Sequence, residues 1–347
     1  MRIESVACET PSLCVGNEEL LRHIELQSRD VPVAKVRQYQ RMVSVLLTKV
    51  GAQTRYVLDR EAGERPFELI RCAMEGALAR ARCVPADVDL LIYCGVGKGF
   101  KEPASAYFYA KAMGMRCDCF DVADACMSWV RSVDIAQQFL MNGRYRRVLV
   151  VNGEFNVFGH GYPELFRVRD LEQLAYTFPT YTIGEAATAT VLSGEGEPWR
   201  FAYLSSPEMC DLCTIALEDF AGYVEASERH NRNGTYKFVS YGAEMFAHAE
   251  EQLVKLITRE VADLYGPRLY VPHAATSQTY IDVARHAGFD AERVFTKVFP
   301  RYGNVVSASV PLGLKMAADE GTLQRGDRVV LIPASAGMSH AVVQMVY

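Results

Sequence analysis

The feature that most constrains the fold is a repeated alternation of helical segments with short apolar runs. Residues 66–82 have the periodicity of an amphipathic helix, and the run 88–94 that follows is short and apolar. The order continues with helical stretches at 103–113 and 126–141 and an apolar run at 147–152. Short apolar runs between helices are typical of buried strands, so this order predicts an α/β fold with a parallel or mixed sheet covered by helices.

The same order returns later in the chain. Its expected elements are helices at 242–263, 277–287 and 309–320, and strands at 269–271, 328–333 and 341–346. We therefore expect an N-terminal half, residues 1–180, and a C-terminal half, residues 181–347. The stretch 155–180 has no clean period, and we expect a loop or cap there.

Composition excludes several classes of protein. Half of the residues are hydrophobic and the net charge is −5, with scattered cations, so we expect a folded protein that binds neither nucleic acid nor membrane. No window approaches the ~18 apolar residues of a membrane span, and the first residues lack a signal-peptide pattern. We expect a cytoplasmic location, in which the ten cysteines remain thiols. The pairs Cys117/Cys119 and Cys210/Cys213 resemble halves of a metal site but lack partner pairs, so we expect no metal.

Cys126 is the first candidate for catalysis. It follows an apolar, extended segment and begins the helical stretch that ends near Met141. A thiol at a helix N-terminus faces unpaired backbone N–H groups and the positive end of the helix dipole, both of which favour the thiolate. The alternative is a buried structural cysteine.

Two polar residues of the second half stand beside expected strands and helices. His273 follows the run 269–271, and Asn304 lies in a Gly-Asn turn before the helix at 309–320. Ligands of α/β sheets gather at the C-terminal ends of strands, which fits both positions. A thiolate can accept an acyl group as a thioester, and His and Asn side chains can stabilise an enolate oxygen. The backbone N–H groups of Cys126 and of the loop Ala334–Met338, with Ala336 at its centre, would form the oxyanion hole.

These residues fall within motifs of a known family. The chain resembles the thiolase-fold condensing enzymes of the ketoacyl synthase III type over most of its length. The matching stretches are Asp121–Cys126, Ile183–Leu192, Asn233–Phe238, Val271–Thr276 and Tyr302–Pro311. The resemblance implies two duplicated βαβαβαββ halves in a five-layered αβαβα arrangement, usually as a homodimer. It also implies acyl-CoA or acyl carrier protein thioesters as substrates, with no further cofactor, and places Asn233 near the substrate tunnel.

One loop resembles a particular branch of that family. Gly95–Ala106, with Glu102-Pro103 inside it, is similar to the loop of enzymes that join two acyl-CoAs head to head for olefin synthesis. In those enzymes the glutamate enters the neighbouring subunit's site as a base. The resemblance therefore implies that Glu102 deprotonates the second thioester, while the alternative is a solvated turn residue.

Departures from the family pattern argue against the ordinary initiation enzyme of fatty-acid synthesis. The arginine associated with carrier-protein docking is replaced in His273–Gln278, and the tryptophan that stacks on CoA adenine is absent. Arg55 remains as a possible contact for a CoA phosphate. Ser335 stands where the family tends to glycine, and His340 replaces a tryptophan. These changes suggest a relative in secondary metabolism or lipid synthesis.

We therefore expect a Cys-dependent acyltransferase that performs a Claisen-type condensation. Two alternatives remain open at this point. The same Cys–His pair could transfer the acyl group to an oxygen or nitrogen acceptor, or hydrolyse the thioester. The chain could instead be the non-catalytic subunit of a condensing heterodimer.

Overall fold

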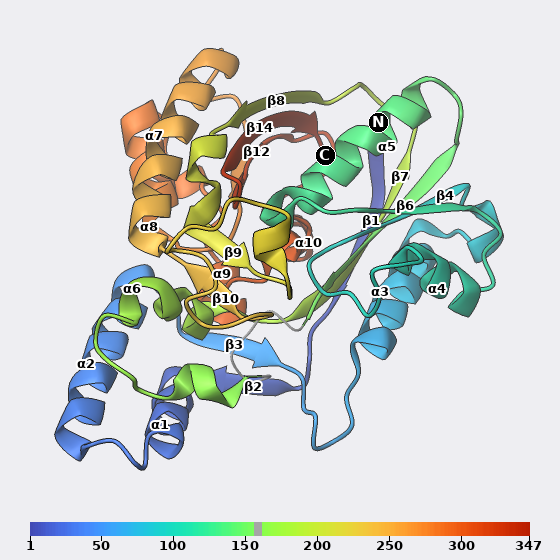
Figure 1. Ribbon diagram of the computed structural model, residues 1–347. Coiled ribbons are helices and arrows are strands. Elements are labelled where there is room, and N and C mark those ends of the chain that lie inside the picture. Colours follow the sequence, from blue (N-terminus) through green and yellow to red (C-terminus); the bar gives the residue numbers. More distant parts are fainter. Residues whose placement is uncertain (156–161) are drawn as a thin grey trace.

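The computed structural model describes residues 1–155 and 162–347 and contains two five-stranded sheets (Figure 1). The strands and helices up to residue 155 are β1 (Arg2–Glu9), β2 (Leu13–Gly16), α1 (Asn17–Gln27), α2 (Val33–Val50), β3 (Thr54–Val57), α3 (Pro66–Ala81), β4 (Leu90–Cys94), α4 (Ser105–Ala112), β5 (Asp118–Val122), α5 (Ser128–Met141) and β6 (Arg147–Glu154). Those that follow are α6 (Leu174–Thr177), β7 (Ala186–Ser193), β8 (Arg200–Ser205), β9 (Cys213–Ile215), β10 (Phe238–Ser240), α7 (Gly242–Glu260), β11 (Leu269–Pro272), α8 (Gln278–Ala287), α9 (Val298–Tyr302), α10 (Ser309–Asp319), β12 (Arg328–Ile332), β13 (Ala334–Ser335) and β14 (Ser339–Val346).

The first sheet has the order β1-β7-β6-β4-β5. β4 runs parallel to β5 and β6, whereas β7 runs antiparallel to β1 and β6. Side chains alternate between its faces: Leu90 and Ile92 join the central core, whereas Leu91 and Tyr93 pack in the core beneath α3 and α4. The sheet is therefore covered on both faces, as its apolar strands require.

The second sheet repeats this plan with the order β11-β12-β14-β13, and β8 pairs with β14. Val329 and Leu331 of β12 face the central core, while Val330 and Ile332 pack beneath α7 and α8. Both sheets thus present one face to the same central core.

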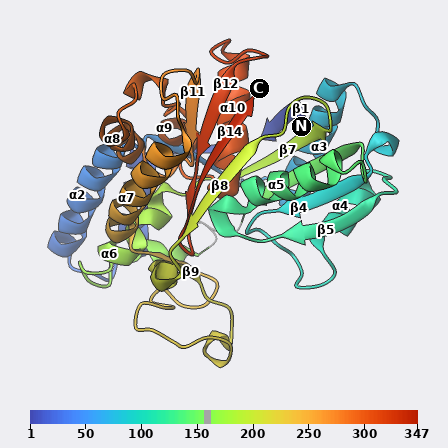
Figure 2. The same ribbon diagram turned by 90° about the horizontal axis from the view of Figure 1, so that it is seen from above.

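Helices α5 and α10 lie in that central core, between the two sheets. Figure 2 shows α7 and α8 on one outer side of the molecule and α3 and α4 on the other. The layers therefore follow the order αβαβα, and the predicted thiolase-like fold is confirmed.

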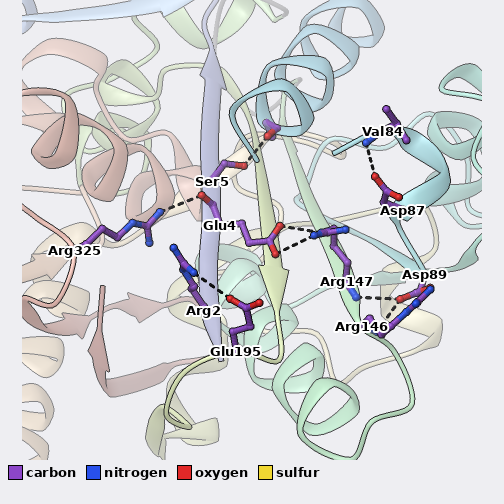
Figure 3. A network of polar contacts seen from close by, with 11 residues as sticks. Arg2, Glu4, Ser5, Val84, Asp87, Asp89, Arg146, Arg147, Glu195 and Arg325 are labelled. Atoms are coloured by element: carbon purple, nitrogen blue, oxygen red, sulfur yellow. Dashed lines mark hydrogen bonds and ion pairs between the residues drawn. The ribbon is translucent and has the colours of Figure 1, made fainter. Parts of the chain in front are cut away.

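Polar contacts also join the two halves along β1 (Figure 3). Arg325, which precedes β12, donates to the backbone carbonyls of Ile3 at 2.6 Å and Glu4 at 3.1 Å. The Glu4 carboxylate in turn accepts from Arg147 of β6 at 2.9 Å. β1 is therefore fixed both within its own sheet and against the C-terminal half.

Most expected elements form within a few residues of their predicted bounds. The main difference concerns β7, which lies after the expected division at 180 but pairs with β1 and β6 in the first sheet. The division into halves at 180/181 stays a prediction, and the first sheet itself extends to Ser193. Of the expected loop at 155–180, residues 156–161 lie outside the described residues, and residues 162–180 form short helical turns with α6. None of the helices in the described ranges is both long and apolar enough to cross a membrane.

Candidate active site

Cys126 lies in a 3-10 turn, Ala125–Met127, between β5 and α5. Ala125 has a φ of +43°, a left-handed conformation that is unfavourable for a residue with a Cβ. The Ser335 hydroxyl holds the turn, because it accepts from the Met127 N–H at 3.2 Å and donates to the Asp124 carbonyl at 3.3 Å. Contacts from β13 of the C-terminal half thus maintain the strained turn that carries the cysteine.

The surroundings of the Cys126 sulfur differ from the sequence-based expectation. Burial raises the pKa of the Cys126 thiol well above its ordinary value, and the nearby Cys213 and Glu154 add to the rise. Hydrogen bonds from the backbone N–H groups of Ala336 and of Cys126 itself act in the opposite direction. The helix N-terminus alone therefore does not produce a resting thiolate. The two N–H groups predicted for the oxyanion hole both lie beside the sulfur.

His273 follows directly after β11 and is buried. Burial lowers the pKa of its imidazole to about 4, although a hydrogen bond to the Val306 backbone acts against this. Its Nδ1 atom is buried and has no hydrogen-bond partner in the described part of the chain. The imidazole is therefore neutral near pH 7 and can accept a proton.

Hydrogen bonds of its backbone and of its side-chain oxygen hold Asn304 in place. Its N–H donates to the Thr182 carbonyl at 2.8 Å, and its own carbonyl accepts from the Gly184 N–H at 3.0 Å. The side-chain oxygen accepts from the Val306 N–H at 2.9 Å. This last bond leaves the amide nitrogen as the group that can donate to a ligand.

These residues line one cavity of about 380 Å³. The turn Val306–Ala308, which follows Asn304, packs against the Ala125–Met127 turn, as does β13. Cys126, His273, Asn304 and Ala336 all line the cavity, so four of the predicted site residues are brought together. The remaining wall is largely apolar and includes Ile183, Ile215, Phe238, Met245, Phe246 and Met338. A cavity of this size and character can hold an apolar acyl group beside a thiol, an imidazole and a carboxamide.

Glu102 does not reach this cavity within the protomer. It is exposed, and it is absent from the cavity lining, although the start of its loop, Gly95, Val96 and Lys98, does line the cavity. A role as base would therefore require delivery into a neighbouring protomer, as the resemblance implies.

Arg55 lies elsewhere and is buried. Its guanidinium donates to Asn17 Oδ1 from both terminal nitrogens at 3.0 Å and to the Val15 carbonyl at 3.2 Å. Burial lowers the pKa of Arg55 to about 10. These contacts join β3 to the end of β2 and the start of α1, so the placement of Arg55 does not support the predicted contact with a CoA phosphate.

Asn233 is also buried and lies outside the cavity lining. Its side-chain oxygen accepts from Arg169 at 2.8 Å and Thr177 at 2.9 Å, and its amide nitrogen donates to the Phe238 carbonyl at 2.7 Å. Asn233 therefore positions Phe238, which lines the cavity, and both its side-chain oxygen and its amide nitrogen already have hydrogen-bond partners.

Sequence reasoning missed several groups around the site. Cys213, considered only as half of a metal site, lines the cavity, as does Tyr280, and Glu154 is buried at the end of β6. The sequence does contain a signal for Glu154, because in Asn152-Gly-Glu154 a carboxyl group directly continues an expected buried strand. The Cys117 and Cys119 sulfurs lie 3.9 Å apart, and within the described ranges no group of three or more His, Cys, Asp or Glu side chains could hold a metal ion.

Comparison with protein families agrees with the fold and the motifs. The family profile described as 3-oxoacyl-[acyl-carrier-protein (ACP)] synthase III matches residues 120–206, and its C-terminal counterpart matches residues 267–347. The first match contains Cys126, and the second contains His273 and Asn304.

Curated relatives cover most of the chain. The beta-ketoacyl-[acyl-carrier-protein] synthase III of Symbiobacterium thermophilum is 28% identical over 298 residues, which are 84% of this chain and 86% of that protein. The protein of the same description from Clostridium tetani is 24% identical over 98% of this chain and 96% of its own length.

Solved structures of Xanthomonas campestris OleA have the same fold. The cerulenin-bound structure aligns with a TM-score of 0.83 and 21% identity, covering 99% of this chain and 96% of that one. A cysteine-to-serine variant of OleA with bound lauric acid and lauroyl-CoA aligns with a TM-score of 0.82 and 21% identity over 99% and 98% of the two chains.

Proposed function

Because the chain is a thiolase-fold condensing enzyme of the ketoacyl synthase III type, we propose that Cys126 carries an acyl group which is then joined to a second thioester. The observation that carries this proposal is the shared cavity, in which Cys126 meets His273 and Asn304 from the other half of the chain.

The first half-reaction forms the acyl-enzyme. Neutral His273 takes the Cys126 proton as the sulfur attacks the carbonyl of an acyl thioester. The backbone N–H groups of Cys126 and Ala336 hold the oxyanion of the tetrahedral intermediate, replacing their hydrogen bonds to the sulfur. When the intermediate collapses, the leaving thiolate takes the proton from His273. The raised pKa of Cys126 suits a thiol that ionises only while its proton is being transferred.

The second half-reaction forms the carbon–carbon bond. The His273 imidazole and the Asn304 amide nitrogen hold the oxygen of an enolate formed from the second thioester. Its carbanion attacks the acyl carbonyl, the Cys126 thiolate leaves, and the proton that the base removed from the α-carbon is returned to the sulfur as the β-keto thioester is released. Glu102 from a neighbouring protomer would remove the α-proton in a condensation without decarboxylation. This assignment rests on the resemblance of its loop and on its exposure in the protomer.

We infer that the acyl donor is acyl-CoA or an acyl carrier protein and that the enzyme acts as a homodimer. OleA, which shares the fold, has been crystallised with lauroyl-CoA, and the matching family profile names the carrier protein. The apolar wall of the cavity favours a fatty acyl group over a charged one.

The test supplies pairs of acyl thioesters and identifies products by mass spectrometry. Wild type should yield a β-keto product, and Cys126→Ala should yield none. Cys210→Ala, which changes an exposed cysteine, is the matched control and should retain full activity. Glu102→Gln should acylate normally but fail to condense two acyl-CoAs. If the enzyme only releases the free acid, or transfers the acyl group to an oxygen or nitrogen acceptor, the proposed condensation is wrong and the enzyme has that activity instead. The absence of any acyl adduct would indicate a non-catalytic subunit.

A further inference from the structure

A buried carboxylate lies behind the active site, and the reaction described above does not use it. Glu154 ends β6, is 1% exposed and does not line the cavity. None of the ion pairs in the described part of the chain includes it. A buried carboxyl without a cationic partner is unfavourable unless hydrogen bonds compensate.

The hydrogen bonds of Glu154 come from two different segments of the site. Oε2 accepts from the Val96 N–H at 3.0 Å. Oε1 accepts from the Ser307 N–H at 3.1 Å and also from the Ser307 hydroxyl. Val96 belongs to the loop that leads to Glu102, and Ser307 lies in the turn that follows Asn304. One carboxylate therefore joins the loop of the candidate base to the turn of the candidate enolate-binding residue.

Both segments are closely fitted to the end of β6. A Cβ on Gly95 would lie 2.7 Å from the Gly153 carbonyl oxygen, and one on Gly97 would lie 2.7 Å from that of Phe155. On the other side, Asn152 Nδ2 donates to the Ser307 hydroxyl at 2.6 Å. Because that hydroxyl accepts from Asn152, its proton is directed to Glu154. Burial raises the pKa of Glu154 more than the hydrogen bonds from Ser307 and Val96 lower it, and the net value is about 7.

We propose that Glu154 is a positioning residue for the condensation step, because it fixes the Gly95–Glu102 loop and the Asn304 turn relative to each other. It acts through Val96 and Ser307 and touches no reacting atom. The Ala125–Met127 turn packs against the Asn304 turn, but it also has its own hydrogen bonds to Ser335, which do not involve Glu154. Loss of the Glu154 contacts should therefore impair the second half-reaction much more than acylation of Cys126. This inference rests on the proposed function.

The test compares Glu154→Ala and Glu154→Gln with Gln137→Ala. Gln137 is a matched control, because it is buried and joins two segments through hydrogen bonds with both the N–H and the carbonyl of Trp199, outside the cavity lining. In single-turnover assays, Glu154→Ala should acylate within about threefold of wild type and condense at least tenfold more slowly, since small displacements of catalytic groups have effects on the order of 100-fold. Glu154→Gln keeps an acceptor oxygen and should recover part of the condensation rate. Gln137→Ala should leave the ratio of the two rates unchanged.

Amide hydrogen exchange provides a second readout that does not depend on activity. Glu154→Ala, or Glu154→Gln should the alanine variant fail to fold, should speed exchange in the peptides covering 95–99 and 304–308. Gln137→Ala should not. Equal losses of acylation and condensation, or unchanged exchange in either peptide, would overturn the proposal. If wild type forms no acyl-enzyme, the proposed function fails, and the exchange experiment still decides whether Glu154 joins the two segments.

Discussion

The buried neutral state of His273 predicts a specific pH dependence of stability. The folded-state pKa of about 4 lies below the ordinary value of 6.5, because burial disfavours the imidazolium. A histidine of this kind stabilises the folded protein fully above pH 6.5, and the contribution is lost as the pH falls, since the unfolded chain then binds the proton more strongly.

The size of the effect follows from these two values. At pH 8 the imidazole is neutral in both states, and at pH 5 it is protonated mainly in the unfolded chain. The free energy of unfolding should therefore fall by about 2 kcal/mol between pH 8 and pH 5 on account of His273, and by about 3.4 kcal/mol once the pH is well below 4.

The assay is urea unfolding of wild type and His273→Asn at pH 8 and pH 5. Glu154 and His340 also have shifted pKa values, but both residues are present in both proteins, so their titration cancels in the comparison. The stability of wild type relative to the variant should decrease by about 2 kcal/mol at the lower pH. If the stability difference between wild type and the variant is the same at pH 8 and pH 5 within about 0.5 kcal/mol, His273 is not a buried neutral imidazole.

Three further predictions concern the cysteine turn, the close approach of Gly184 to Tyr302 and the reactivity of Cys126. Ser335→Ala removes both hydrogen bonds across the cysteine turn. It should lower the free energy of unfolding by about 1 kcal/mol and slow acylation of Cys126 several-fold. An unchanged acylation rate would argue against a role for Ser335 in holding the turn. Gly184→Ala would place a Cβ 2.0 Å from the Tyr302 carbonyl oxygen and should destabilise the protein by at least about 1–3 kcal/mol in thermal unfolding. Gly99→Ala, whose Cβ would have no atom of the described residues within 4 Å, should be nearly neutral. Alkylation of Cys126 by iodoacetamide should keep accelerating above pH 9, because burial raises the thiol pKa; a rate already constant by pH 7 would contradict this.

Local patterns predicted much of the fold. The apolar run at 88–94 and the helical period of 66–82 depend only on neighbours in sequence, and they correspond to β4 and α3. The placement of β7 in the first sheet was not predicted, since strand pairing across a long sequence separation leaves no local periodicity. Helices α1 and α2, inserted between β2 and β3, were likewise not assigned in advance.

The site shows a similar limit. Its chemical groups could be selected from the positions of Cys126 and His273 after strands and of Asn304 in a turn before a helix, and the structure places all three around one cavity. The burial that raises the pKa of Cys126 is a tertiary effect that opposes the local effect of the helix N-terminus. The partners of Arg55 are also set by tertiary structure. The sequence suggested Arg55 for a phosphate contact, whereas in the folded chain its guanidinium donates to Asn17.

The most direct test of the account is to map the acyl group to a residue. The protein is incubated with a fatty acyl-CoA, digested, and every one of its ten cysteine-containing sites is examined by mass spectrometry. The account predicts the acyl mass on Cys126, with loss of the adduct in Cys126→Ala. An adduct on Cys213, which lines the same cavity, or acylation that persists in the Cys126 variant, would contradict it.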